Sequence, residues 1–270
     1  MRQLIFTAFL FTINLVVNGQ DFNKEDFPPN SIEKKGWRLV ISDEFNVPSL
    51  NEQLWIPYYF RHRDRNAKAL YTFRQGCLVL QLDSGRRVSS IQTIERTNLH
   101  KLGKDSIPTL VKFAQKYGYF EIRAKTQYGS GHNSAFWLVG VQNNSKQTAE
   151  IDVFEQPGHL GEDLILFNLY GWGDSSLVSK KGKGNRWPNK LNLKKDLSKT
   201  FNVYGLEWTP KSLKLYFNNQ LIKVIPKSPR YPMGVLLSLY ERSDWLGPID
   251  KSIPYPKEFI IDYFRVYEKK

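Results

Sequence analysis

The sequence has little of what disulfide-bonded and metal-binding proteins need. Its 270 residues include one cysteine, Cys77, together with four histidines and two methionines. A single cysteine excludes an intramolecular disulfide and argues against zinc fingers and ribbons, which need several thiolates. Within the apolar segment Cys77-Leu78-Val79-Leu80 it is interpreted as a small buried hydrophobic residue.

Long apolar runs are scarce as well. The most extended one, residues 4–17, is shorter than the roughly 20 apolar residues that a transmembrane helix needs. It follows Arg2 and precedes Gly19, a pattern typical of a secretory signal peptide over residues 1–19. The alternative is an amphipathic or buried N-terminal helix. We therefore expect a secreted or periplasmic protein without a membrane span.

Acidic residues are in deficit. The chain has 39 Lys and Arg against 26 Asp and Glu, a net charge of +13, which favours an anionic partner. Export argues against nucleic acid and leaves an acidic polysaccharide as a candidate. Two basic runs, residues 61–65 and 180–187, carry much of the excess. They are interpreted as solvated loops or, alternatively, as sites for sulfate or carboxylate groups of a substrate.

Helical periodicity is also missing, whereas short strand-like segments are frequent. Residues 20–35 are polar and contain Pro28-Pro29, as expected of an N-terminal arm or linker before one folded domain over residues 36–270. Strands are predicted at residues 38–41, 78–82, 119–125, 135–139, 151–154, 164–169, 203–208, 213–217, 221–225, 235–239 and 260–267. The link 218–220 predicts a hairpin loop. Together these features predict an all-β antiparallel sandwich or barrel.

The densest group of chemically active side chains is the segment 149–158, Ala-Glu-Ile-Asp-Val-Phe-Glu-Gln-Pro-Gly. In a regular strand Glu150 and Asp152 share one face and Glu155 lies on the other. A β-bulge at residues 153–154 would place all three carboxylates on one face and bury one of the two bulge residues opposite. Two such carboxylates are what glycoside hydrolysis needs. From spacing alone, a solvated acidic edge or a calcium-binding patch is an equal alternative.

The flanking segments make one family resemblance specific. Tyr-Gly-Tyr-Phe-Glu-Ile-Arg-Ala at 117–124, Ser-Ala-Phe-Trp-Leu at 134–138, the acidic strand, Tyr-Gly-Leu-Glu-Trp-Thr-Pro at 204–210 and Ile-Asp-Tyr-Phe-Arg-Val-Tyr at 261–267 follow in that order. Over residues 37–267 the chain closely resembles glycoside hydrolase family 16. The bulged motif is similar to the branch that includes laminarinases, agarases, carrageenases and porphyranases.

This resemblance implies an antiparallel β-sandwich of the jelly-roll, concanavalin-like type with an open substrate cleft. It also implies a retaining endo-β-glycosidase that requires no cofactor. Glu150 is then the nucleophile, Asp152 the residue that tunes and orients it, and Glu155 the acid/base. A non-catalytic polysaccharide-binding protein and a wall transglycosylase on the same fold remain alternatives.

Sugar polymers bind to flat aromatic surfaces and to polar groups beside them. The resemblance implies that Trp137 lies in the cleft floor and that Asn168 and Trp172 lie next to the acidic strand. With residues from the loop before the Trp137 segment and from the end of a late strand, the expected substrate-binding residues are His132, Asn133, Trp137, Asn168, Trp172, Glu241, Arg242 and Trp245. The expected substrate is a polysaccharide, either a β-1,3-glucan or a sulfated galactan, bound by a monomer. The resemblance also suggests a structural calcium ion at Glu44 and Asp262, which otherwise are surface carboxylates.

Overall fold

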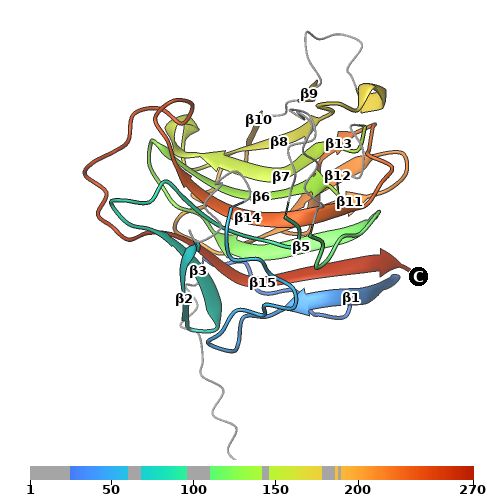
Figure 1. Ribbon diagram of the computed structural model, residues 1–270, viewed down its shortest axis with the longest axis horizontal. Helices are drawn as coiled ribbons and strands as arrows, with labels where there is room; N and C mark the ends of the chain where they lie inside the picture. Colours follow the sequence, from blue (N-terminus) through green and yellow to red (C-terminus); the bar gives the residue numbers. More distant parts are fainter. Residues whose placement is uncertain (1–24, 60–67, 96–109, 142–145, 178–185, 188–189) are drawn as a thin grey trace, which may run out of the picture.

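The protein is described by a computed structural model that covers residues 25–59, 68–95, 110–141, 146–177, 186–187 and 190–270 (Figure 1). The predicted signal peptide, the first basic run and most of the second lie outside the described residues. Within the described ranges, no helix has the length and apolar character needed to cross a membrane.

Two antiparallel sheets form the fold. The larger has the strand order β13-β12-β11-β5-β15-β3-β2, with β1 paired to β15, and the smaller has the order β10-β8-β7-β6-β14-β4, with β9 paired to β8. In Figure 1, β8, β7, β6 and β14 follow one another as neighbouring curved strands. This arrangement confirms the predicted antiparallel sandwich.

The strands of the larger sheet are β1 (Trp37–Asp43), β2 (Leu70–Arg74), β3 (Cys77–Leu82), β5 (Gly118–Lys125), β11 (Asn202–Trp208), β12 (Leu213–Phe217), β13 (Gln220–Ile225) and β15 (Lys257–Lys269). Those of the smaller sheet are β4 (Val88–Gln92), β6 (His132–Gly140), β7 (Glu150–Pro157), β8 (Leu164–Tyr170), β9 (Arg186–Trp187), β10 (Lys190–Asn192) and β14 (Met233–Glu241). The short 3₁₀ turns η2 (Gly158–Leu160) and η3 (Ser175–Leu177) follow β7 and β8.

Each predicted strand lies within an observed one, whereas β2, β4, β9 and β10 were not predicted. These four are short, and β4 is rich in serine, so none carries a strong apolar alternation. The predicted hairpin is confirmed, because Phe217 pairs with Gln220 across Asn218 and Asn219. Both asparagines have positive φ, of 49° and 66°, as a two-residue type I′ turn requires.

The core lies between the sheets and is built by alternating residues of facing strands. Phe120 and Ile122 of β5 point into it from the larger sheet, and Phe136 of β6 points into it from the smaller one. Phe154 of β7 packs on Tyr204 of β11 with ring centroids 4.2 Å apart. Buried apolar area contributes about 25 cal/mol per Å², so this interdigitated layer supplies the main stabilisation and fixes the register of β7.

The arm that precedes β1 is docked on the outer face of the larger sheet. The Phe27 amide donates to the Phe201 carbonyl at 2.9 Å, and Arg123 Nε donates to the Phe27 carbonyl at 2.8 Å. Asn30 Nδ2 donates to Glu121 Oε2 at 2.9 Å. Because of this cover, Glu121 and Arg123 are completely buried although they alternate with the core residues of β5. Residues 25–35 are therefore a packed arm.

Candidate active site

The β7 strand contains the bulge that the spacing of its acids predicts. Trp137 of β6 pairs with Asp152, but the preceding residue, Phe136, pairs with Phe154, so Val153 is the extra residue. The pairing with β8 breaks at the same place. Val153 and Phe154 are both buried in the core, where only one was expected. The bulge restores the parity of the strand and turns its acids to one side.

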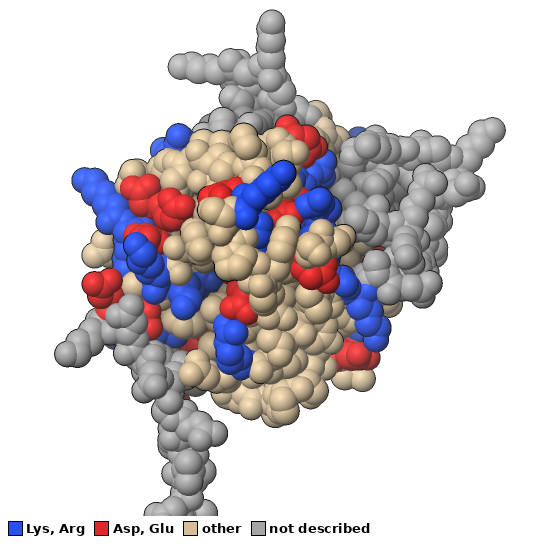
Figure 2. Space-filling view, turned by 90° about the vertical axis from the view of Figure 1, so that its left-hand side faces the viewer, with Lys and Arg blue, Asp and Glu red and all other residues tan. Residues whose placement is uncertain are grey.

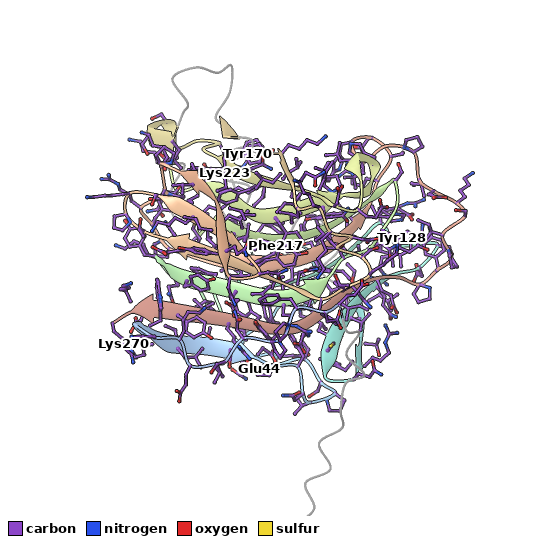
Figure 3. The ribbon with its side chains drawn as sticks, turned by 180° about the vertical axis from the view of Figure 1, so that it is seen from behind. Glu44, Tyr128, Tyr170, Phe217, Lys223 and Lys270 are labelled. Atoms are coloured by element: carbon purple, nitrogen blue, oxygen red, sulfur yellow. The ribbon has the colours of Figure 1, made fainter. Side chains whose placement is uncertain are left out.

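A cleft of about 340 Å³ opens on the face of the smaller sheet that carries these acids. It is lined by Tyr59, Ala135, Trp137, Glu150, Asp152, Glu155, Leu166, Tyr170, Trp172, Tyr240, Arg242 and Trp245. The cleft therefore brings the three predicted acids together with four of the eight predicted binding residues. Tyr170, labelled in Figure 3, lies at the end of β8.

Three lining tyrosines were not predicted as binding residues. Tyr170 lies two residues before Trp172, and Tyr240 directly precedes Glu241; both Trp172 and Glu241 were predicted to bind substrate. The alternation of side chains along these strands was the signal that could have identified the two tyrosines. Tyr59 comes from the loop before β2, and its ring lies edge-on to Tyr240 with centroids 5.7 Å apart. Nothing in the local sequence of this loop indicates that tertiary contact.

Two asparagines hold the carboxylates from below. Asn168 Nδ2 donates to Asp152 Oδ2 at 3.0 Å and to Glu155 Oε2 at 3.1 Å. Asn133 Nδ2 donates to Glu155 Oε1 at 3.2 Å. Both asparagines are completely buried and absent from the cleft lining. The structure thus places them as supports of the acids, in contrast to the expected contact with substrate.

Asp152 is the most buried of the three acids. Burial, followed by the neighbouring charges of Glu155 and Glu150, raises the pKa of Asp152 well above its ordinary value. Asp152 also shares a side-chain hydrogen bond with Glu155, whereas Glu150 acts on it through charge. The raised pKa favours the neutral form of Asp152, and the hydrogen bond links this group to Glu155.

The indoles divide between the floor and the rim of the cleft. Trp137 is nearly buried, and its Nε1 donates to Ser238 Oγ at 3.0 Å, so its ring forms part of the cleft floor. Trp172 and Trp245 are more than one third exposed and form part of the cleft rim. Trp172 Nε1 donates to Glu150 Oε2 at 3.2 Å. Rings at both levels give a sugar chain apolar faces on which to stack.

His132 and Glu241 do not line the cleft, which corrects the prediction for both. His132 Nε2 lies 3.1 Å from Glu241 Oε2, and both side chains are completely buried. Lys257 Nζ donates to the same oxygen at 2.7 Å, and Tyr255 and Arg87 also contact Glu241. We call these five residues the Glu241 cluster. Arg242 does line the cleft, where its Nε donates to Asp244 Oδ1 at 2.9 Å.

The Glu241 cluster has the opposite electrostatic character to the acidic strand. Burial alone would raise the pKa of Glu241, but hydrogen bonds from Lys257, Tyr255 and His132 hold it below its ordinary value. Burial and the charge of Lys257 lower the pKa of His132. The cluster is a buried, hydrogen-bonded ion pair with the imidazole of His132 beside it. It fastens the ends of β6, β14 and β15 to one another.

Glu44 and Asp262 do not fit a calcium ion. Glu44, labelled in Figure 3, accepts two hydrogen bonds from Arg265, at 2.8 and 2.7 Å. Asp262 accepts one from Arg123 at 2.9 Å. Each carboxylate is therefore held by an arginine, and the described residues contain no group of three His, Cys, Asp or Glu side chains able to hold a metal.

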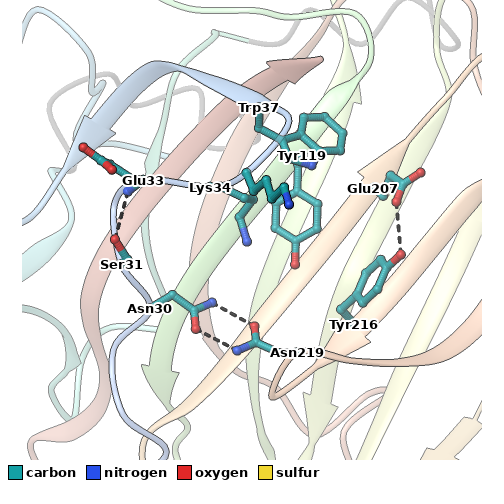
Figure 4. A pocket seen from close by; sticks show the side chains of 10 residues that line it. Asn30, Ser31, Glu33, Lys34, Trp37, Tyr119, Glu207, Tyr216 and Asn219 are labelled. Carbon is teal, nitrogen blue, oxygen red and sulfur yellow. Dashed lines mark hydrogen bonds between the residues drawn. The ribbon is translucent and has the colours of Figure 1, made fainter. Parts of the chain in front are cut away.

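A second hollow, of about 410 Å³, lies between the arm and the outer face of the larger sheet (Figure 4). Its floor includes Tyr119, Glu207 and Tyr216. Glu207 accepts from Tyr216 at 3.0 Å and from Lys214 at 2.9 Å. This carboxylate is neutralised by a lysine, and the second acid of the lining, Glu33, lies on the arm at the opposite side of the hollow. The hollow therefore does not offer the closely spaced pair that double displacement needs.

Comparison with known proteins connects this cleft to glycan hydrolysis. The profile of glycosyl hydrolases family 16 matches residues 67–257. A GlcNAcα1-4Gal-releasing endo-β-galactosidase from Clostridium perfringens is 35% identical and superimposes with a TM-score of 0.80, covering 90% of this chain and 66% of its own. A β-glucanase from Rhodothermus marinus is 24% identical, covering 97% of this chain and 93% of its own.

A keratan-sulfate endo-1,4-β-galactosidase from Sphingobacterium multivorum is 23% identical, covering 86% of this chain and 55% of its own. The laminarinase catalytic domain from Thermotoga petrophila shares the fold, with a TM-score of 0.66 at 23% identity, covering 87% of this chain and 98% of its own. This chain thus spans nearly all of some relatives and between half and two thirds of others.

Proposed function

Because this chain belongs to glycosyl hydrolases family 16, we propose that it cleaves internal β-glycosidic bonds of a glycan by double displacement, with retention of the anomeric configuration. The observation that carries the proposal is the bulge at Val153, which turns the carboxylates of β7 into one aromatic-lined cleft. Without the bulge, Glu155 would face the core side of the sheet.

The proposed reaction uses two of the acids directly. Protonated Glu155 gives its proton to the glycosidic oxygen while the Glu150 carboxylate attacks the anomeric carbon, so that the leaving sugar departs and a glycosyl ester forms on Glu150. Glu155, now a carboxylate, then takes a proton from a water molecule. That water attacks the anomeric carbon and releases Glu150 as a carboxylate.

The buried groups beneath the acids prepare Glu155 for both steps. The amides of Asn133 and Asn168 each donate to one of its oxygens, which limits its rotation. Asp152 shares a hydrogen bond with it, and burial raises the pKa of Asp152, which favours its neutral form. A neutral neighbour avoids the repulsion that a third carboxylate would add when Glu155 gives up its proton.

For the substrate we propose a β-galactoside within a complex glycan. The support is the 35% identity over 90% of this chain with an enzyme named as an endo-β-galactosidase, together with the galactosidase named for keratan sulfate. A β-glucan is the second candidate, supported by the β-glucanase that matches 97% of this chain. Both belong to the same proposed reaction and differ in the sugar that the cleft accepts.

An anionic substrate is a further proposal, and its support comes mainly from the net charge of +13. Among the described lining residues, Arg242 is the basic side chain in the cleft. Figure 2 shows a face on which Lys and Arg are interspersed with Asp and Glu. The described surface in that view therefore offers no broad basic patch. The first basic run and most of the second, interpreted as solvated loops or alternatively as anion sites, lie outside the described residues.

We also propose that the protein is exported through residues 1–19 and acts as a monomer. Export places it where extracellular glycans are found and agrees with the single cysteine, which is buried and whose thiol pKa burial raises to about 12. Mass spectrometry of the secreted protein would test the first point by its N-terminal residue, and light scattering would test the second by its mass.

The test is product analysis on laminarin, mixed-linkage glucan, agarose, porphyran, carrageenan, keratan sulfate and mucin-type glycans. We expect oligosaccharides from a galactose-containing substrate, with the β-anomer formed first in time-resolved NMR. Glu150→Gln should lower turnover by at least roughly 1,000-fold while binding is retained, and Glu207→Gln in the outer hollow is the matched control. Full activity of Glu150→Gln, or first formation of the α-anomer, would refute the proposed mechanism.

The same experiment addresses the two alternatives. A transglycosylase would give longer products when oligosaccharide acceptors are added, because the glycosyl ester passes to a sugar instead of water. A binding protein would retain affinity for one of these glycans and release no product from any of them.

A further inference from the structure

Trp172 occupies a backbone conformation that its side chain disfavours. It follows β8 in a tight turn in which the Asp174 amide donates to the Gly171 carbonyl at 2.7 Å. Trp172 is the second residue of this turn and has a φ of 45°. Positive φ at this position is usually taken by glycine. Gly171 and Gly173 stand on either side, yet the left-handed position carries an indole.

Neighbouring groups hold this conformation in place. The indole stacks on Tyr170, with ring centroids 5.0 Å apart and an angle of 8° between the planes. On the other side of Trp172, the Gly173 amide donates to Thr148 Oγ1 at 2.8 Å. Strained residues persist when the surroundings determine them, and they concentrate at functional sites, where the strain serves a geometry that a relaxed backbone would not give.

The left-handed turn brings the Trp172 indole into contact with Glu150, a reacting group of the proposed mechanism. Trp172 Nε1 donates to Glu150 Oε2 at 3.2 Å, and the indole lies at the rim of the cleft. Glu150 pairs with Tyr170 across the β7–β8 ladder, so the stacked ring comes from the residue directly beside the carboxylate. One oxygen of Glu150 is thus occupied by the indole, which orients the carboxylate.

We propose that Trp172 is a positioning residue for the nucleophile: its indole N–H holds one oxygen of Glu150 and orients the other toward the anomeric carbon. This inference rests on the proposed function, because it assigns Glu150 the attacking role. Hydrogen bonds to a charged acceptor are stronger than neutral ones, and a rigid indole loses little freedom in making one. The ring can in addition stack on a sugar, so the residue combines two roles.

Other ionisable side chains share the cleft with Glu150. They are Asp152 and Glu155 on β7, Tyr170 on β8, Tyr240 and Arg242 at the end of β14, and Tyr59 in the loop before β2. Replacing the indole by a phenyl ring leaves all of these in place. Trp172→Phe therefore isolates the N–H, because an aromatic ring is kept at the same position.

The experiment compares the steady-state kinetics of the full chain with those of Trp172→Phe. We expect kcat to fall roughly 10- to 100-fold, the range for losing a hydrogen bond to a charged group, while KM changes much less. Trp245→Phe is the matched control: it replaces another rim indole by a phenyl ring, and it should alter KM more than kcat.

A measurement without turnover separates this inference from the proposed function. The indole ¹H–¹⁵N resonance of Trp172 should move in Glu150→Gln, which removes the charged acceptor, and should keep its position in Glu207→Gln. If Trp172→Phe keeps the wild-type kcat, or if the indole resonance is the same in Glu150→Gln and the wild type, the positioning role is refuted even when the enzyme is active. If no glycan is cleaved but the resonance moves in Glu150→Gln, the contact is real and the proposed reaction is refuted.

Discussion

The smaller sheet carries two buried acidic sites that differ in their neighbours. On β7, Asp152 lies between two other carboxylates, and the partners described for the three acids are neutral amides and an indole. At the end of β14, Glu241 is surrounded by Lys257, Arg87, Tyr255 and His132. Asp152 and Glu241 are both buried, so the difference between them comes from the charged groups beside each one.

The neighbours of a buried acid decide whether it can take part in proton transfer. The pKa of Glu241 is lowered, so the group stays ionised and contributes to joining three strand ends. The pKa of Asp152 is raised, so a proton is retained beside Glu155 at a pH where exposed acids have lost theirs. A carboxyl cluster that keeps a proton can supply a general acid, whereas a carboxylate tied to a lysine cannot.

The strongest test of this difference removes the cation from the Glu241 cluster. Lys257→Met keeps the length of the side chain but leaves a buried carboxylate with a weaker set of partners, and we expect a loss of about 3 kcal/mol in the free energy of unfolding. Because the pKa of Glu241 is lower in the folded state, its ionised form stabilises the fold above the unfolded pKa of 4.5. The loss caused by Lys257→Met should therefore shrink as pH falls below that value. Urea unfolding at several pH values measures both effects, and a stable variant would refute the structural role.

The acidic strand should respond in the opposite direction. Because the folded pKa of Asp152 is raised, the folded state binds its proton more tightly, and this contribution is lost as pH rises above 3.8 toward the folded pKa. Asp152→Asn removes that loss. We expect it to be more stable than the wild type by about 1 kcal/mol near neutral pH and nearly equal near pH 4, in thermal unfolding, with lower activity. Equal stability at both pH values would contradict the burial of a neutral Asp152.

The smallest effect is expected at an ion pair near the surface. Lys214 lies 2.9 Å from Glu207 on the outer face of the larger sheet, and both side chains are partly exposed. Lys214→Met should change the free energy of unfolding by less than about 1 kcal/mol, because water screens exposed pairs. A loss as large as that of Lys257→Met, measured in the same urea series, would show that burial is not what distinguishes the two lysines.

Several parts of the site could be predicted because local sequence determines them. The alternation of β5 and β12 gives their buried faces, and the spacing of Glu150, Asp152 and Glu155 gives the bulge, since only an extra residue puts all three on one side. Trp137 and Trp172, which line the cleft, were expected from the family resemblance of their segments. Family resemblance supplied the jelly-roll arrangement and the roles of the acids.

Other parts depend on contacts between residues far apart in the chain. Asn133 and Asn168 were expected to bind sugar, but the pairing of β6 and β8 with β7 places their amides beneath the acids. His132 and Glu241 are opposite each other in the β6–β14 ladder, and β15 adds Lys257, which turns a predicted cleft wall into a buried ion pair.

The sequence by itself determined the strands, the bulge and the grouping of three acids, because backbone parity and apolar alternation act over a few residues. Only the tertiary structure decided which polar groups are removed from water together. That choice sets the raised pKa of Asp152, the lowered pKa of Glu241 and the hydrogen bond from Trp172 to Glu150. Electrostatic energies depend on distance and burial in three dimensions, and these are fixed when separate strands pair.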